Sequence, residues 1–269
     1  MTLSNMKKPL IIALSVIVAA ILIFLVFFTF PSNYKNTIRV RETSISTNQE
    51  GQPIRIGIFA DTMIGFDYQV ENLDLLVQTV NDSNVDVLIF NGGLLYNEEI
   101  SSDDRSKIEE AFNSMRARFG KFAIPSDTDS QLSDEILFNG GFELLENTNR
   151  PLIINQRNIV ISGLLTQNFT NPLADLNEDN VNVAFTHTPE NNAQIRAFNV
   201  NAIVSAKGFG GQYVFPLFGS VYEDLRALPY YRGVTRYDDI TIIANNGIGI
   251  NRGSMRFNAP STLDILTIN

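Results

Sequence analysis

The side chains best suited to chemistry follow short apolar runs of the sequence. Asp61 directly follows the run IRIGIFA, and His187 directly follows the run VNVAFT. Asp127 lies a few residues beyond a third apolar stretch. Carboxylates and imidazoles are the side chains that hold catalytic metal ions, and such an ion activates water for hydrolysis. His187 is also the chain's only histidine, so it could serve in a Ser-His-Asp hydrolase, whereas a metal site built from several imidazoles is excluded.

The apolar runs predict the strands that would position these side chains. IRIGIFA (54–60) and VDVLIFN (85–91) have the length and composition of buried strands. Apolar residues at helical spacing predict a helix over 70–83 and another over 103–119, which Gly120 would end. We expect further strands near residues 37–46, 121–124, 158–162, 181–186, 202–205, 239–244 and 263–268. Helices alternating with early strands, followed by crowded later strands, indicate an α/β fold with a mixed sheet or two packed sheets.

Length and composition limit the kinds of function. A chain of 269 residues is typical of one large domain. The absence of cysteine excludes disulfides, zinc-thiolate sites and a cysteine nucleophile. The net charge of −9 argues against nucleic acid as a partner, because phosphate binding needs a basic surface.

The N-terminal region predicts a membrane anchor. Residues 9–30 carry no charge, and as a helix they would be about 33 Å long, enough to span a bilayer. A cleaved signal peptide is the main alternative, although no A-x-A-like site follows Phe30. We divide the chain into a tail (1–8), this anchor, a juxtamembrane linker with a first strand (31–52) and a globular domain (53–269).

Five stretches together resemble the motifs of the calcineurin-like metallophosphoesterases, in the same order and with matching spacing. They are IRIGIFADTMIG, VDVLIFNGGLLYN, GKFAIPSDTD, VAFTHTPE and AIVSAKGFGGQYVFP. The ending NNGIGINRGSMRFNAPSTLDILTI also resembles the close of the membrane-associated branch of that family. The resemblance covers about residues 53–269. It implies a four-layer α/β/β/α sandwich preceded here by one transmembrane helix.

The resemblance also implies a site with two metal ions at the strand ends, which activate a bridging water. Three of the seven ligand positions keep side chains that could coordinate: Asp61, Asp127 and His187. Asp127 stands where the family has asparagine. Gly93 replaces the aspartate that would bridge both metals, and Thr128 replaces the catalytic histidine. Met63, Lys207 and Phe209 replace the remaining histidines.

We therefore predict a metal site that has decayed. With the bridging carboxylate and three imidazoles missing, we expect no metal cofactor and no confident catalytic residue. Met63 and Phe209 are interpreted as apolar filling of the former metal pocket. The Lys207 ammonium could pair with Asp61 or Asp127, or it could point into solvent. Asp61, Asp127, His187 and Lys207 are thus the candidates for binding a ligand.

Three functions are compatible with this reading. The first is a catalytically inactive, membrane-anchored pseudo-phosphoesterase that binds an envelope protein or a phosphorylated ligand. The second is a hydrolase that uses one weakly bound divalent metal (Mn, Zn or Fe) on Asp61, Asp127 and His187. The third is a structural protein of the bacterial cell envelope with an empty pocket. Lys7 and Lys8 before the apolar segment favour a single-pass protein with its N-terminus inside and its domain outside the cell membrane.

Overall fold

The computed structural model describes residues 11–22 and 35–269. Two six-stranded sheets form the centre of the domain, in the orders β1-β14-β2-β3-β4-β5 and β12-β13-β9-β8-β7-β6. The first sheet contains β1 (Ile38–Ile45), β2 (Ile54–Phe59), β3 (Val87–Phe90), β4 (Lys121–Ala123), β5 (Glu143–Leu144) and β14 (Ser261–Ile268). The second contains β6 (Thr148–Ile154), β7 (Arg157–Leu164), β8 (Val181–Thr186), β9 (Ala202–Ser205), β12 (Gly233–Tyr237) and β13 (Ile240–Ala244).

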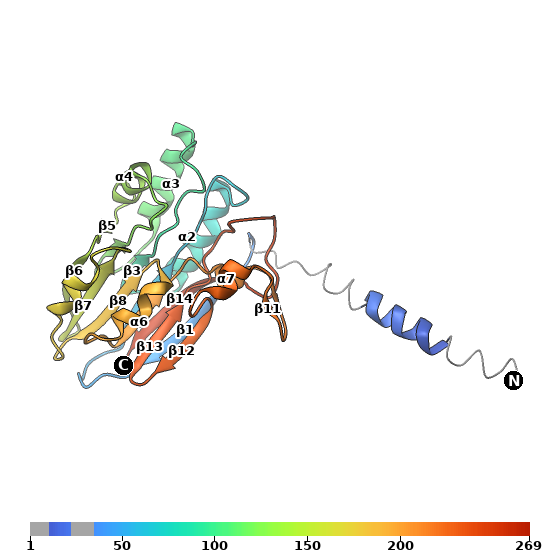
Figure 1. Ribbon diagram of the computed structural model, residues 1–269. Helices are drawn as coiled ribbons and strands as arrows, with labels where there is room; N and C mark the ends of the chain where they lie inside the picture. Colours follow the sequence, from blue (N-terminus) through green and yellow to red (C-terminus); the bar gives the residue numbers. More distant parts are fainter. Residues whose placement is uncertain (1–10, 23–34) are drawn as a thin grey trace, which may run out of the picture.

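The two sheets pack face to face, and helices cover their outer faces. An aliphatic core between the sheets joins residues of both, among them Ile56, Ile89 and Val183, which are fully buried. The helices α2 (Leu73–Asp82), α3 (Ser102–Ser114) and α4 (Gln131–Asn139) cover the outer face of the first sheet (Figure 1). The short helices α5 (Thr170–Ala174) and α6 (Asn192–Ile195) contribute side chains to the hydrophobic cluster on the outer face of the second sheet. The mixed α/β fold that the sequence predicts is confirmed.

Strand direction determines where the functional residues meet. Strands β2, β3, β4 and β5 run parallel in one sheet, and β7, β8, β9 and β13 run parallel in the other. Parallel strands bring their carboxyl ends to one edge, where α/β proteins carry their sites. We call this edge, where β2, β3, β8 and β9 end, the site edge.

Most predicted elements are present, with differences at their ends. The predicted helix 103–119 ends at Ser114, because Met115 adopts an extended backbone (φ −70°, ψ 132°). Gly120 therefore precedes β4 and does not cap that helix. The first strand is not part of a separate linker, since β1 pairs along its whole length with β14. The folded unit thus includes residues before 53.

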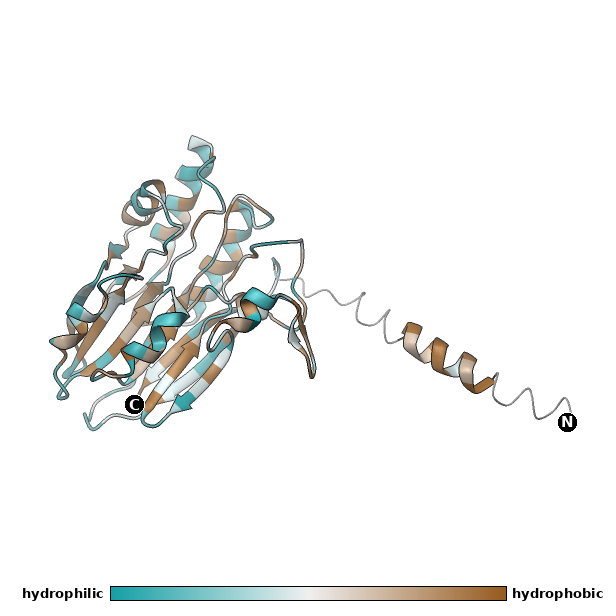
Figure 2. Cartoon of the chain, in the orientation of Figure 1, coloured by the Kyte–Doolittle hydropathy of each residue, from teal (hydrophilic) through white to brown (hydrophobic). Residues whose placement is uncertain are grey.

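The segment before the domain is only partly described. Residues 11–22 form a helix of mostly hydrophobic residues (Figure 2). Their large apolar side chains are exposed. The rest of the predicted span, at 9–10 and 23–30, and the predicted tail at 1–8 lie outside the described residues. Within residues 11–22 and 35–269, no helix is both long enough and apolar enough to cross a membrane.

The start of α4 yields a prediction on the pH dependence of stability. Burial raises the pKa of the Asp134 carboxyl to about 6, and the charges of Glu146 and Asp129 add to this effect. In the part of the chain described, its buried Oδ1 has no hydrogen-bond partner. Because the folded pKa lies above the unfolded value, this group favours the folded state at low pH and loses that contribution as the pH rises through 6.

We expect Asp134→Asn to raise the free energy of unfolding by about 1 kcal/mol at pH 7.5, after allowing for solvent screening of a half-exposed group. The gain should shrink as the pH falls from 6 towards 3.8. Urea unfolding at several pH values measures it. Asp74→Asn, at the exposed start of α2, is the matched control, and an equal gain at all pH values for Asp134→Asn would contradict the prediction.

Candidate functional site

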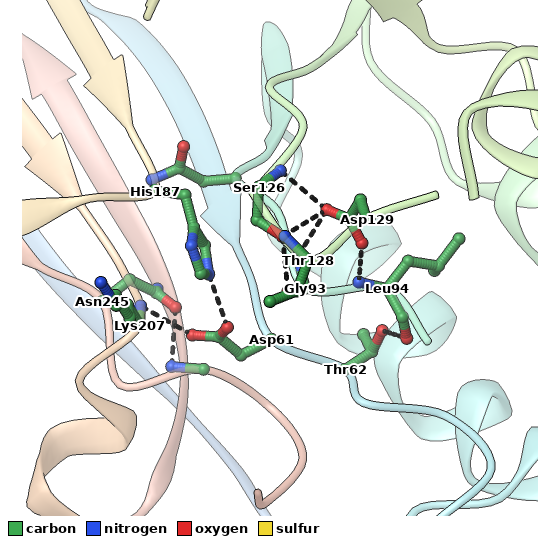
Figure 3. Close-up of polar contacts among 12 residues, drawn as sticks. Asp61, Thr62, Gly93, Leu94, Ser126, Thr128, Asp129, His187, Lys207 and Asn245 are labelled. Carbon is green, nitrogen blue, oxygen red and sulfur yellow. Dashed lines mark hydrogen bonds and ion pairs between the residues drawn. The ribbon is translucent and has the colours of Figure 1, made fainter. Parts of the chain in front are cut away.

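Asp61 and His187 form a buried pair between the two sheets. Asp61 follows β2 in the first sheet and His187 follows β8 in the second, and the His187 Nε2 lies 2.8 Å from Asp61 Oδ1 (Figure 3). Asp61 is 1% exposed and His187 is 9% exposed. Burial lowers the pKa of His187, but the charge and hydrogen bond of Asp61 raise it, and the net pKa is above its ordinary value. The Asp61 carboxylate therefore favours the protonated, charged form of the His187 imidazole.

The second oxygen of Asp61 is also occupied. The backbone N–H of Lys207 donates to Asp61 Oδ2 over 3.0 Å (Figure 3). A buried carboxylate needs such partners to offset its lost hydration. His187 and one peptide group thus supply the compensation that metal cations would supply in the family that the sequence resembles.

Lys207 lies at the site, but its ammonium does not pair with Asp61 or Asp127 as one sequence interpretation had it. Its Nζ forms an ion pair of 3.1 Å with Glu190, and both side chains are exposed. The backbone of Lys207 is left-handed, with φ 67°. This turn directs the N–H towards Asp61 and leaves the ammonium at the surface.

Gly93 occupies the position of the bridging aspartate, and its backbone is tightly enclosed. It has a left-handed φ of 77°. A Cβ added there would lie 2.5 Å from Asp61 Oδ1 and 3.0 Å from Asp61 Cα. The present position of Asp61 therefore excludes a side chain at residue 93.

Asp129 holds this loop in place, although the sequence analysis did not single it out. Its carboxylate accepts hydrogen bonds from the backbone N–H groups of Gly93, Leu94 and Ser126 at 2.8–2.9 Å (Figure 3). It also accepts one from the Ser126 hydroxyl. The signal was present, because Asp129 is the last residue of the stretch GKFAIPSDTD. Asp129 is a positioning residue that links the loops after β3 and β4.

Asp127 and Thr128 are exposed on the same loop. The Asp127 carboxylate accepts a hydrogen bond from the Thr166 hydroxyl. The Thr128 hydroxyl lies 3.0 Å from the Ser126 hydroxyl. Thr128 cannot replace a catalytic histidine, because a hydroxyl of ordinary acidity is a poor proton donor at neutral pH.

Met63 and Phe209 both lie at the site, as expected. Phe209 is buried and Met63 is half-buried. Both have left-handed backbones, with φ values of 49° and 48°. Residues other than glycine seldom adopt this conformation, and it is frequent at functional sites. The loops keep an unusual geometry while apolar side chains occupy the positions of the ligands.

An open pocket of about 520 Å³ lies over these residues. Its lining includes all the predicted site residues except Gly93, together with apolar side chains from α7 (Glu223–Ala227) and the loop after it. They are Asp61, Met63, Asp127, Thr128, His187, Lys207, Phe209, Leu225 and Leu228. The size suits a small ligand or the head of a larger one.

The residues present do not fit a two-metal centre. Asp61 already uses both oxygens, and an imidazolium must lose its proton before it can bind a metal. Gly93 offers no bridging group. Among the described residues, no group of three or more His, Asp or Glu side chains could hold a metal ion.

A curated relative supports the resemblance to metallophosphoesterases. The chain is 23% identical over 221 residues to YkuE of Bacillus subtilis (strain 168), described as an uncharacterized metallophosphoesterase, and the match covers 78% of this chain and 77% of that protein. No protein-family model matches the chain.

Solved structures with a similar arrangement have low sequence identity. The phosphopantetheinyl hydrolase PptH of Mycobacterium tuberculosis is 12% identical, with a TM-score of 0.45 and coverage of 76% of this chain and 92% of that one. GAP50, titled the anchor in the inner membrane complex of Plasmodium, is 10% identical, with a TM-score of 0.47 and coverage of 80% of each chain.

Proposed function

We propose that this chain, a relative of the metallophosphoesterases, is a membrane-anchored pseudo-phosphoesterase that binds a ligand or partner without hydrolysing it. The observation that carries the proposal is the state of Asp61. This carboxylate is fully buried and bonded to His187 and to the Lys207 N–H. Groups of the protein itself occupy both of its oxygens, while the pocket beside it stays open.

The missing groups argue against hydrolysis. A two-metal mechanism needs a side chain that holds both cations close together, and Gly93 has none. Loss of the general acid at Thr128 would alone cost a factor of about 10² to 10⁴ in rate. A hydrolase with one metal would have to break the Asp61–His187 pair before either residue could coordinate.

The proposed ligand is a phosphorylated molecule or a protein of the cell envelope. The pocket combines the Lys207 ammonium, which is paired at the surface with Glu190, with apolar side chains such as Phe209 and Leu225. A lysine can bind phosphate as a point charge, and the apolar wall suits the remainder of such a molecule. Residues 9–30 supply the proposed anchor, which places the domain outside the membrane.

We expect the full-length chain, purified in detergent, to retain substoichiometric metal after incubation with excess manganese and zinc followed by desalting. It should not hydrolyse a generic aryl phosphate, because Asp61 and His187 bind each other. Elemental analysis and an absorbance assay measure the two quantities. About two ions per chain together with turnover would overturn the proposal, since that is the complement of a working two-metal site.

The same preparation separates a binding protein from a structural one. A ligand that binds only the folded state stabilises it by about 2.7 kcal/mol at a hundred times its dissociation constant. Phosphate esters with and without an apolar tail are suitable probes, and the melting temperature is the measurement. A rise that Lys207→Ala or Phe209→Leu abolishes would place the ligand in this pocket.

A further inference from the structure

A short hairpin beside the site carries the most exposed large apolar side chains in the described domain. The strands β10 (Val214–Phe215) and β11 (Gly219–Ser220) pair antiparallel, and their turn projects from the body of the domain (Figure 1). Leu217 is 100% exposed and Phe218 is 78% exposed. Val221, just after β11, is also exposed. We call Leu217, Phe218 and Val221 the apolar tip.

A second exposed apolar spot lies at the same edge of the sheets. The rings of Phe66 and Tyr96 stack with centroids 4.4 Å apart, and both residues are partly exposed. Phe66 is in the loop after β2, and Tyr96 is in the loop after β3. Both loops leave the site edge. The hairpin of the apolar tip is held at this edge too, because the Ser220 hydroxyl donates to the carbonyl of Gly211, in the loop after β9.

The chain also enters the domain at the site edge. Ile38, the first residue of β1, is opposite Ser261, the first residue of β14. Since β14 runs antiparallel to β2, these first residues lie where β2 ends. Just before β1, the Lys35 ammonium forms a 3.0 Å ion pair with Asp67, next to Phe66. The chain at Lys35 therefore meets the domain beside Phe66, at the site edge.

Amphipathic side chains surround the base of the hairpin. The rings of Tyr213 and Tyr222 meet edge to face, with centroids 5.9 Å apart. The Arg226 guanidinium donates to the carbonyl of Ser220. Tyrosine and arginine are typical of the boundary between lipid headgroups and acyl chains, where one end of the side chain is apolar and the other is hydrated.

We propose that the apolar tip inserts into the lipid headgroup–acyl boundary of the bilayer, so that the site edge and its pocket face the membrane. This rests on the proposed function, which anchors the chain through residues 9–30. The entry of the chain at Lys35, the Phe66–Tyr96 pair and the apolar tip then lie on the side of the domain that faces the bilayer. Each exposed apolar side chain that leaves water favours this orientation.

A second copy of this chain fits the hairpin less well. A stable protein interface buries about 800 Å² on each partner, whereas the tip is three side chains on a narrow turn. The net charge of −9 also disfavours contact between identical surfaces. A bilayer requires neither a large area nor a complementary shape.

The chain contains no tryptophan, so a single substitution gives a specific fluorescent reporter. We would place Phe218→Trp in the full-length chain, reconstituted in phosphatidylcholine vesicles. The expected result is emission shifted to shorter wavelength and quenched by lipids brominated near the headgroup. The matched control is Phe138→Trp, because Phe138 is similarly exposed but lies on α4, away from the site edge. Its emission should stay unshifted and unquenched.

Flotation of the same vesicles separates the insertion of the apolar tip from the membrane anchor of the proposed function. A chain that floats, with Phe218→Trp unshifted and unquenched, overturns the insertion of the tip and leaves the anchor intact. A chain that does not float overturns both. A blue shift without quenching by brominated lipid means that protein covers the tip, and this also overturns the proposal. Adding Leu217→Ser to the Phe218→Trp chain should reduce the quenching, since a polar residue weakens insertion.

Discussion

Replacing His187 with alanine is expected to lower the free energy of unfolding by about 3–5 kcal/mol, which is the range for breaking a buried ion pair from one side. The substitution removes the imidazole 2.8 Å from Asp61 Oδ1. Among the described residues, it leaves only the Lys207 N–H as partner of a carboxylate that is 1% exposed. Urea unfolding at pH 7 followed by circular dichroism measures the loss.

Two further variants make this result specific. Adding Asp61→Asn to His187→Ala should recover part of the stability, because an amide has no charge to neutralise. Lys207→Ala removes the exposed ion pair with Glu190 and should cost at most about 1 kcal/mol. If His187→Ala cost no more than Lys207→Ala, the buried pair would not be what stabilises the site.

The buried strands of this domain can be predicted from the sequence because they depend on hydrophobic patterning. The runs at 54–60 and 85–91 become β2 and β3, and their carboxyl ends bring Asp61 and Gly93 together. Such runs have few alternatives to a buried strand between two layers. The resemblance to known motifs then identifies which strand ends carry candidate site residues.

The ends of helices and the partners of side chains are less predictable. Apolar residues at helical spacing continue past Ser114, but Met115 has an extended backbone and the chain leaves the helix there. The partner of Lys207 depends on a left-handed turn that places its N–H, not its ammonium, against Asp61. Asp129 stands at the end of the stretch GKFAIPSDTD, which marks the residue, but its backbone partners in two loops are visible only in the structure.

Three residues of the site share an unusual backbone conformation. Met63, Lys207 and Phe209 differ in chemistry, yet all three keep left-handed φ values. Left-handed backbone at such residues costs about 1–3 kcal/mol each and persists where the surroundings demand it. The surroundings thus hold these three residues in a conformation that costs free energy, although their side chains have no chemistry in common. This is consistent with a pocket that still binds something.

The second large effect is expected at Gly93. Gly93→Ala should lower the free energy of unfolding by about 3 kcal/mol or more, because it combines left-handed strain with overpacking against Asp61. Gly233→Ala is the matched control, since Gly233 has φ 82° but nothing within 4 Å of an added Cβ. In the control, the free energy of unfolding should fall only by the cost of the left-handed backbone, about 1–2 kcal/mol.

Gly93→Asp, which returns the carboxylate expected from the family resemblance, should be no more stable than Gly93→Ala. Its Cβ meets the same atoms of Asp61, and it brings a second negative charge to a carboxylate that His187 already neutralises. Manganese or zinc should not raise the melting temperature of this variant, because Asp61 and His187 bind each other and not a cation. A metal-dependent rise in melting temperature would contradict this and mean that one substitution is enough to reopen the site. Gly93 alone would then close the site to metal, whereas the contacts of Asp61 with His187 and the Lys207 N–H predict that it does not.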